Sequence, residues 1–516
     1  MNRNRYGFVL SCGLLAVGMT VRANNMSVTN ITLVDSGVGY THVACDVSWD
    51  NSWRASWQEG SSTVTNWDAA WVFIKFRVAT NNAPWQHATL STNKSDHIIP
   101  AQAVFNVGTS SNAVSAKLGV GGFLYRKDED SGNWTNRIKL CWNYVQDGVA
   151  STSQVVVSVH AIEMVYVPQG SFYVGDGTTT TITGQFCSNT TQTVPFQITS
   201  DAEITLGGGT DGCLGNNNVS GMVTKDDFSN TVSRTLPAAF PKGYNAFYCM
   251  KYEISQGQWI SFFNMLSDSG NQKKSGDLTA GRDITGGSKG TTGKGTDNEV
   301  DRNTIAWAGI GSAATCTNAS GVSCADRACN YLSSADGCAY ADWAGLRPMT
   351  ELEFEKACRG PLYPVANEYA WGSTFKQALT NFAGIDGSGT EIALPTNANY
   401  AGGAVRCGIF ATASSTRVTA GATYWGIMEM SGNIFERAVG VGSGSLRSFT
   451  GVHGDGLLDA NGNADCGWPT AGMRGGTYVY DPTGYRTSDR GRTSQVYTWR
   501  TNINGFRCVR SAPAGE

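Results

Sequence analysis

Apolar and polar residues alternate in short runs through the first third of the chain. The runs lie between Asn25 and His160, repeat with a period of two, and are separated by Gly, Asn, Asp and Ser. This period is typical of strands that bury one face, and frequent turn residues favour antiparallel neighbours. The pattern predicts an antiparallel β-sandwich over residues 24–160, with strands near 41–49, 70–78, 116–125, 138–144 and 154–159. Six tryptophans (Trp49, Trp53, Trp57, Trp67, Trp71 and Trp85) are expected to pack in or beside its core; a sugar-stacking platform is the alternative.

The alternation continues through residues 161–168 without a polar linker, which predicts that the two halves of the chain share an interface. Beyond it, helix signals are few. Ser255 precedes a helical apolar pattern, Ser334 precedes a second, and Thr350 forms a capping box with Glu353 in a helix that ends at Gly360. We therefore predict an α+β domain over residues 161–513. Two polar, glycine-rich stretches, 178–230 and 267–301, are interpreted as inserted surface loops.

Residues 1–23 have the features of a signal peptide: basic residues, then an apolar run, then small residues before Asn24. A lipoprotein anchored through Cys12 is a less favoured interpretation. No later run reaches the ~18 apolar residues that a membrane span requires. We expect an exported protein that is periplasmic, on the cell surface or secreted. A formal net charge of −3 gives no basic field for nucleic acid, so nucleic acid is not an expected partner.

The cysteine count predicts disulfides in an oxidising compartment. Of 14 cysteines, 13 remain after removal of the signal peptide, so at least one lacks an intramolecular partner. Cys45 and Cys141 fall on different predicted strands and are a candidate inter-sheet bridge. Cys324 can pair with Cys329 or with Cys316, and the sequence leaves both pairings open.

Seven segments occur in an order that resembles the formylglycine-generating-enzyme, or sulfatase-modifying-factor, family. They are Met164–Phe172, Tyr252–Gln256, Ala341–Glu355, Ala370–Gly372, Trp425–Glu436, Arg474–Tyr478 and Gly505–Arg510. The resemblance implies a C-type-lectin-like fold with small antiparallel sheets, few helices and long loops. It also implies that Cys508 meets a helical cysteine; the family's position matches Ala341, but Cys338 lies one turn earlier on the same face.

For a full member, the resemblance would imply a copper-dependent oxidase that converts a substrate cysteine to formylglycine and binds copper through two cysteines. The matching positions here are Tyr480 and Tyr485. Tyrosine is a hard oxygen ligand that stays protonated near neutral pH, whereas Cu(I) prefers thiolates. Catalytic copper is therefore not expected and we favour a non-enzyme. An oxidase that uses Cys466 through a different loop alignment remains the alternative.

The resemblance further implies a structural calcium site with only oxygen ligands, as calcium requires. Its ligands would be Glu429, the carbonyls of Gly432 and Ile434, and Glu436. The alternative is that Glu436 pairs with a nearby arginine.

The segment 479–504 is the predicted ligand-binding surface because it concentrates Tyr, Trp and Arg, which dominate recognition surfaces. Its candidate residues are Tyr480, Asp481, Tyr485, Arg486, Asp489, Arg490, Arg492, Tyr497, Trp499 and Arg500. The segment also resembles the variable region of target proteins of diversity-generating retroelements. We predict a non-catalytic scaffold that binds a protein or glycan. A structural component of a surface or secretion assembly is a further alternative, and so is a purely structural role for these side chains.

Overall fold

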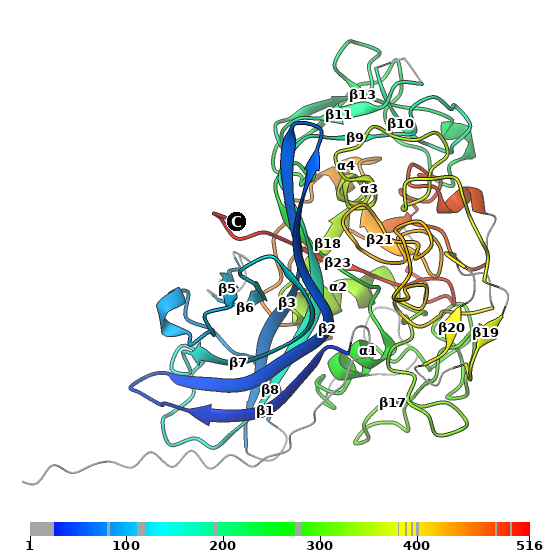
Figure 1. Cartoon of the computed structure of the whole chain (residues 1–516). Helices are drawn as coiled ribbons and strands as arrows, with labels where there is room; N and C mark the ends of the chain where they lie inside the picture. The colour runs from blue at the N-terminus through cyan, green and yellow to red at the C-terminus, as the bar shows by residue number, and fades with distance from the viewer. Residues whose placement is uncertain are drawn as a thin grey trace, which may run out of the picture.

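The computed structural model describes residues 25–516, apart from 80–82, 111–118, 190–192, 270, 274–280, 380, 387–389, 394–395, 399–401, 480–481 and 496–497. The predicted signal peptide and Cys12 lie outside the described residues. The described part is rich in strands and contains few helices, as expected for an α+β chain (Figure 1). None of its helices has the length and apolar character needed to cross a membrane.

Strands of the N-terminal region pack as two layers around an apolar core. They are β1 (Ser27–Val34), β2 (Thr41–Glu59), β3 (Ser62–Val78), β4 (Gln86–His87), β5 (Ala103–Gly108), β6 (Gly121–Arg126), β7 (Asp130–Trp142) and β8 (Val155–Val167). One layer joins β1, β2 and β7, and the other joins β3 to β4, β6 and β8. Val47, Val72 and Leu140 are fully buried between them. This arrangement agrees with the predicted sandwich.

The two halves of the chain share one sheet. β8 pairs with β3 from Val155 to Val165, and its last residues, Met164–Val167, also pair with β15 (Phe247–Met250) of the second half. The sheet continues through β23 (Cys508–Ser511), β18 (Arg347–Thr350), β21 (Glu436–Val439) and β22 (Gly472–Arg474). The predicted boundary between residues 160 and 161 therefore lies inside a continuous strand.

The hairpin of β2 and β3 also reaches the second half of the chain (Figure 1). Its distal part pairs Arg54–Glu59 with Ser62–Trp67. Trp57 donates a hydrogen bond from Nε1 to Tyr424 Oη at 2.9 Å. Trp53 and Trp57 both pack against a core cluster of the second half that contains Trp425. Trp49, Trp67 and Trp71 are buried as well, so most tryptophans of this region pack in cores or at the junction.

Three helices begin where a side chain caps the N-terminus. α1 (Gln256–Phe263) has Ser255 as its N-cap, and α3 (Glu351–Arg359) has the Thr350–Glu353 capping box. Gly360 ends α3 at a φ of 69°, a conformation that costs glycine least. α2 (Ser334–Trp343) is capped by Ser333, one residue before the predicted position. The short α4 (Gly444–Arg447) follows β21.

The predicted loop 178–230 is wrong as a plain loop, because it contributes strands to a small sheet with its own core. β10 (Phe186–Ser188), β13 (Leu214–Asn216), β12 (Ile204–Leu206) and β14 (Arg234–Leu236) pair in that order. Phe186, Leu206 and Phe228 are buried beneath it. Nearby, β9 (Phe172–Val174) pairs with β11 (Phe196–Ile198). In contrast, the described residues of 267–301 contain no helix or strand.

The remaining elements are short and are spread along the chain. They are the strand pairs β16 (Ile305–Ala306) with β17 (Thr315–Cys316) and β19 (Phe382–Ala383) with β20 (Ile392–Ala393), and the 3-10 helices Lys94–Asp96, Val219–Gly221 and Pro482–Tyr485. They connect loops rather than extend the main sheet.

The expected disulfides are not formed among the described cysteines, since all 13 from Cys45 to Cys508 carry free thiols. The Cys45–Cys141 bridge is wrong because both residues lie on neighbouring strands of one layer, where Cys45 faces Ile138 and Cys141 faces His42. Three residues of register are roughly 10 Å along a strand, beyond the reach of a disulfide. Cys338 and Cys508 share a buried core cluster but are not bonded.

Candidate functional site

The residue predicted to match the second catalytic cysteine of the family, Tyr485, is a buried packing residue. Tyr485 has no exposed surface and lies in one cluster with Tyr369, Trp371 and Ala398. Its hydroxyl donates to the carbonyl of Thr477 at 2.7 Å, so both polar groups are satisfied. Tyr480, at the first matching position, lies outside the described residues.

The predicted ligand-binding segment does not form one continuous surface. Besides Tyr485, Arg490 and Arg500 are fully buried, which contradicts their assignment to a surface. Arg500 donates to both carboxylate oxygens of Asp336, at 2.7 and 2.9 Å. Of the other candidates, Trp499 is 48% exposed and Arg486, Asp489 and Arg492 are half-buried, while Asp481 and Tyr497 lie outside the described residues.

Arg490 belongs to a buried ladder of ion pairs that crosses α3. It lies between Asp226 and Glu351, with contacts of 2.8 and 2.6 Å. The ladder then alternates through Arg474, Glu355, Arg359 and Glu368. Glu351 and Glu355 are one turn apart and therefore face the same side of α3. The i,i+4 carboxylates after the capping box were a visible sign of this ladder, but the sequence did not identify their partners.

The segment predicted to bind calcium, residues 429–436, contributes two buried carboxylates, Glu429 and Glu436, that lie near Arg507. Glu436 accepts from Arg507 at 2.9 Å, and Glu429 accepts from the backbone N–H of Gly408 at 2.9 Å. Each of these carboxylates keeps one buried oxygen without a hydrogen-bond partner. Burial, opposed by Arg507, raises the pKa of both side chains to about 7. Glu253 lies in the same group, and burial followed by repulsion from Glu436 raises its pKa well above its ordinary value.

The backbone of this segment is unusual and fits a built site. Glu429 and Asn433 both adopt positive φ angles, 57° and 58°, which non-glycine residues rarely do. The orphaned oxygens of Glu429 and Glu436 are hard ligands that a calcium ion would satisfy. The ion pair with Arg507 shows that the alternative contact of Glu436 is also present. The donor set is therefore compatible with calcium.

A hollow of about 230 Å³ lies next to the Tyr485 cluster. Its lining contains hydroxyl and amide side chains together with two phenylalanines: Phe375, Gln377, Thr396, Asn397, Phe410, Thr412, Ser414, Ser415 and Thr419. Trp371 connects it to Tyr485 by donating from Nε1 to the carbonyl of Phe375 at 2.7 Å. Phe375 is 53% exposed. No side chain among these described lining residues carries a charge.

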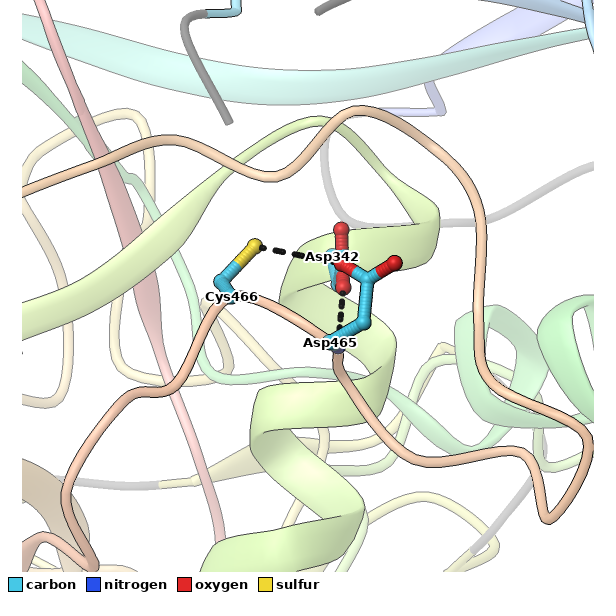
Figure 2. A group of neighbouring side chains, drawn as sticks. All are labelled: Asp342, Asp465 and Cys466. Atoms are coloured by element: carbon cyan, nitrogen blue, oxygen red, sulfur yellow. Dashed lines mark hydrogen bonds between the residues drawn. The ribbon is translucent and has the colours of Figure 1, made fainter. Parts of the chain in front are cut away.

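Sequence reasoning did not anticipate a group formed by Asp342, Asp465 and Cys466. One ligand atom of each lies within 4.8 Å of the others, and Figure 2 shows Asp342 of α2 facing the two loop residues. Asp342 accepts backbone N–H groups from Asp465 and Asp455, both at 3.1 Å. Burial, then repulsion from Asp455 and Asp465, raises the pKa of Asp342 to about 8. These two hydrogen bonds hold Asp342 against the loop that carries Asp465 and Cys466.

Cys466 does not have the environment of a reactive thiol. Burial, followed by repulsion from Asp342 and Asp465, raises the pKa of its thiol far above the ordinary range. Copper-binding and nucleophilic cysteines require the opposite shift, because the thiolate is the active form.

A comparison with models of known protein families identifies the family of this chain. Residues 149–512 match a family model described as the sulfatase-modifying factor enzyme 1-like domain. The match covers more than two thirds of the chain and includes β8, the strands β15, β18, β21, β22 and β23 that continue its sheet, and the helices α1 to α3. The chain therefore belongs to this family. No curated protein matches it.

Proposed function

We propose that this chain is a non-catalytic member of the sulfatase-modifying-factor family that serves as a binding scaffold. One observation supports the proposal: Tyr485, which the family resemblance aligns with a catalytic cysteine, is buried and hydrogen-bonded within the fold. A phenol in this position can neither bind Cu(I) as a thiolate does nor reach a substrate thiol. The residue that supports chemistry in full members acts here as a packing residue.

The competing function is oxidation of a cysteine-containing peptide. To test it, the mature protein is titrated with Cu(I) under reducing conditions, and a cysteine peptide is followed by mass spectrometry. We expect neither tight copper binding nor a product with the mass of formylglycine. Tight binding together with that product would overturn the proposal, and a Cys466→Ser variant would then show whether this cysteine takes part.

We propose that the ligand is a neutral glycan or a protein segment, bound at the hollow beside Tyr485. An exposed aromatic face with neutral hydroxyl and amide groups around it suits a sugar ring, which presents both C–H and O–H groups. Within 479–504, half-exposed Trp499 is a further candidate contact. If a retroelement diversifies this segment, variation at buried Arg490 and Arg500 would disrupt the fold, so we expect it at exposed positions.

A glycan array with the mature protein tests this binding site. Phe375→Ala is expected to abolish binding to any glycan that the native protein retains. Tyr363→Ala is the matched control, because Tyr363 is also 53% exposed but packs on Tyr173 instead of lining the hollow. Equal glycan binding by the two variants would show that the binding site is not this hollow. If the native protein binds no glycan, a protein ligand or a structural role in an assembly would be favoured.

We also propose that the segment 429–436 binds a structural calcium ion through Glu429, Glu436 and the carbonyls of Gly432 and Ile434. The two buried carboxylate oxygens without partners support this assignment. Calcium is expected to raise the melting temperature relative to EGTA, because a ligand that binds only the folded state stabilises it. Glu429→Gln should remove that difference. An identical melting temperature in calcium and EGTA would refute the site.

Export is a proposal that rests on the pattern of residues 1–23. The N-terminal residue of the protein purified from the cell envelope and from the medium would test it. We expect the chain to begin at Asn24.

A further inference from the structure

A cavity of about 270 Å³ separates the sandwich from the two helices packed on it. One wall is the face of β3 and β8 that carries Phe73, Arg77 and His160. The opposite wall comes from α1 and α2 and includes Tyr340 and Trp343. The cavity is distinct from the hollow beside Tyr485, because the two share no lining residue.

Aromatic rings form much of this cavity. The rings of Phe73 and His160 stack with centroids 5.1 Å apart, and Trp343 meets both rings edge-on, at 5.1 and 4.9 Å. Trp85 adds a further ring near Arg77, and Tyr340 lies beside Trp343. These ring faces and edges favour a ligand with a flat aromatic ring over one with a flexible alkyl chain. Offset-stacked and edge-to-face ring pairs contribute binding free energy beyond that of the apolar area they bury.

Arg77 gives the cavity a positive charge. Its guanidinium lies over the Trp85 ring at 4.9 Å and makes no hydrogen bond or ion pair with any described residue. No acidic side chain is among the described residues that line the cavity. Arg77 is therefore the charged group that the described lining offers to a ligand.

We propose that this cavity binds a small planar aromatic anion, such as an aryl carboxylate, with its charge on Arg77. The size of the cavity sets the scale, since a cavity of about 150 Å³ accommodates one benzene ring. A space of about 270 Å³ therefore accommodates a bicyclic ring system with a short acidic group. Most of the ligand would be buried by apolar walls, and Arg77 would fix its orientation. This proposal does not depend on the proposed function.

The chain itself provides the competing occupant. Met26 and Val28 line the cavity, so the competing occupant within the proposed mature chain is the pair of residues before Met26, Asn24 and Asn25. An aromatic anion is favoured because neither residue is acidic and able to pair with Arg77.

The experiment uses the mature protein and three probes measured by calorimetry. The probes are 2-naphthoate, its neutral analogue 2-naphthylmethanol, and octanoate, which carries the same charge without a ring. We expect 2-naphthoate to bind at one site and each control probe to bind about tenfold more weakly, a difference of about 1.4 kcal/mol. Arg77→Gln should reduce the affinity for 2-naphthoate by about tenfold and leave that for 2-naphthylmethanol unchanged. Arg137→Gln, at an exposed arginine of β7, is the matched control and should change neither affinity.

Val156→Trp provides a second, independent test, because it fills the cavity from a half-buried position opposite Arg77 in the β3–β8 pairing. It should abolish binding of both naphthyl probes while the circular dichroism spectrum stays native. Equal affinities for 2-naphthoate and its neutral analogue, no binding at about 1 mM, or undiminished binding to Val156→Trp would each overturn the proposal. Binding that appears only when the chain starts at Met26 would identify its own N-terminal segment as the occupant and would also overturn it.

Discussion

Replacement of Arg490 by methionine tests whether the predicted binding segment supports the fold. Arg490 donates to Glu351 at 2.6 and 3.0 Å, to Asp226 at 2.8 and 3.3 Å, and to the carbonyl of Gly184 at 2.7 Å. All three side chains of this ion-pair group are completely buried. Methionine preserves much of the volume but leaves two carboxylates without this cation.

The expected loss of unfolding free energy is about 3–5 kcal/mol, the usual cost of breaking a buried ion pair from one side. We expect a value near the middle of this range, because Glu351 keeps the backbone N–H of Val441 at 2.7 Å and Asp226 keeps the amide of Asn216 at 2.9 Å. A loss of about 4 kcal/mol corresponds to about a thousandfold change in the folding equilibrium.

Equilibrium urea unfolding, followed by circular dichroism, measures this change. Arg492→Met is the matched control, since Arg492 is half-buried and donates to Gln495 at 3.0 Å, and it should cost less than about 1 kcal/mol. Similar stabilities for both variants would refute the ion-pair reasoning. If the Arg490→Met protein were fully stable but no longer bound the ligand, Arg490 would have to be assigned to the ligand-binding site.

Three further perturbations test other parts of the structure. Gly337→Ala should destabilise the protein by about 1–3 kcal/mol in urea unfolding, because the new methyl group would lie 1.7 Å from the ring of Phe506; wild-type stability would contradict this packing. Tyr485→Phe should cost about 1–2 kcal/mol by the same assay, since it leaves the carbonyl of Thr477 buried without its donor, and no loss would argue against that bond. The raised pKa of Asp342 means that the folded state retains a proton that the unfolded chain releases. The stability that this proton contributes is therefore lost as the pH rises from about 4 to about 8. Asp342→Asn should flatten the decline in stability across this window, and an unchanged slope would show that another group causes it.

Local signals in the sequence predicted the parts of the fold that local interactions determine. The caps at Ser255 and Thr350 are formed by residues three positions apart, so their side chains and backbone partners are visible in a short window. The strand around 41–49 was visible because residues 45–49 alternate between buried and half-buried positions, and the strand around 70–78 was visible as a mainly apolar run that is buried on both faces. The strands of 178–230 were not, because three residues are too few to establish a period of two.

Long-range partners explain why the predicted site was only partly right. Arg490 and Arg500 resembled recognition residues in the sequence, but their carboxylate partners are 139 and 164 residues away, at Glu351 and Asp336. A similar limit applies to Cys45 and Cys141, whose separation depends on the register of two strands. The sequence predicted that Tyr485 replaces a thiol of the family, and that alignment stays a prediction; only the three-dimensional packing reveals the hydrogen bond of Tyr485 to Thr477.

The strand β8 has a consequence for any attempt to divide this chain. A truncated protein that begins at residue 161 would lose the first half of β8 and all of β3, which pairs with it. The remaining residues of β8 would become an unprotected sheet edge of mainly apolar side chains, Met164, Val165, Tyr166 and Val167. Exposed edges of this kind pair with other chains, so the protein truncated at residue 161 should aggregate, whereas the intact chain covers that edge with its own sandwich.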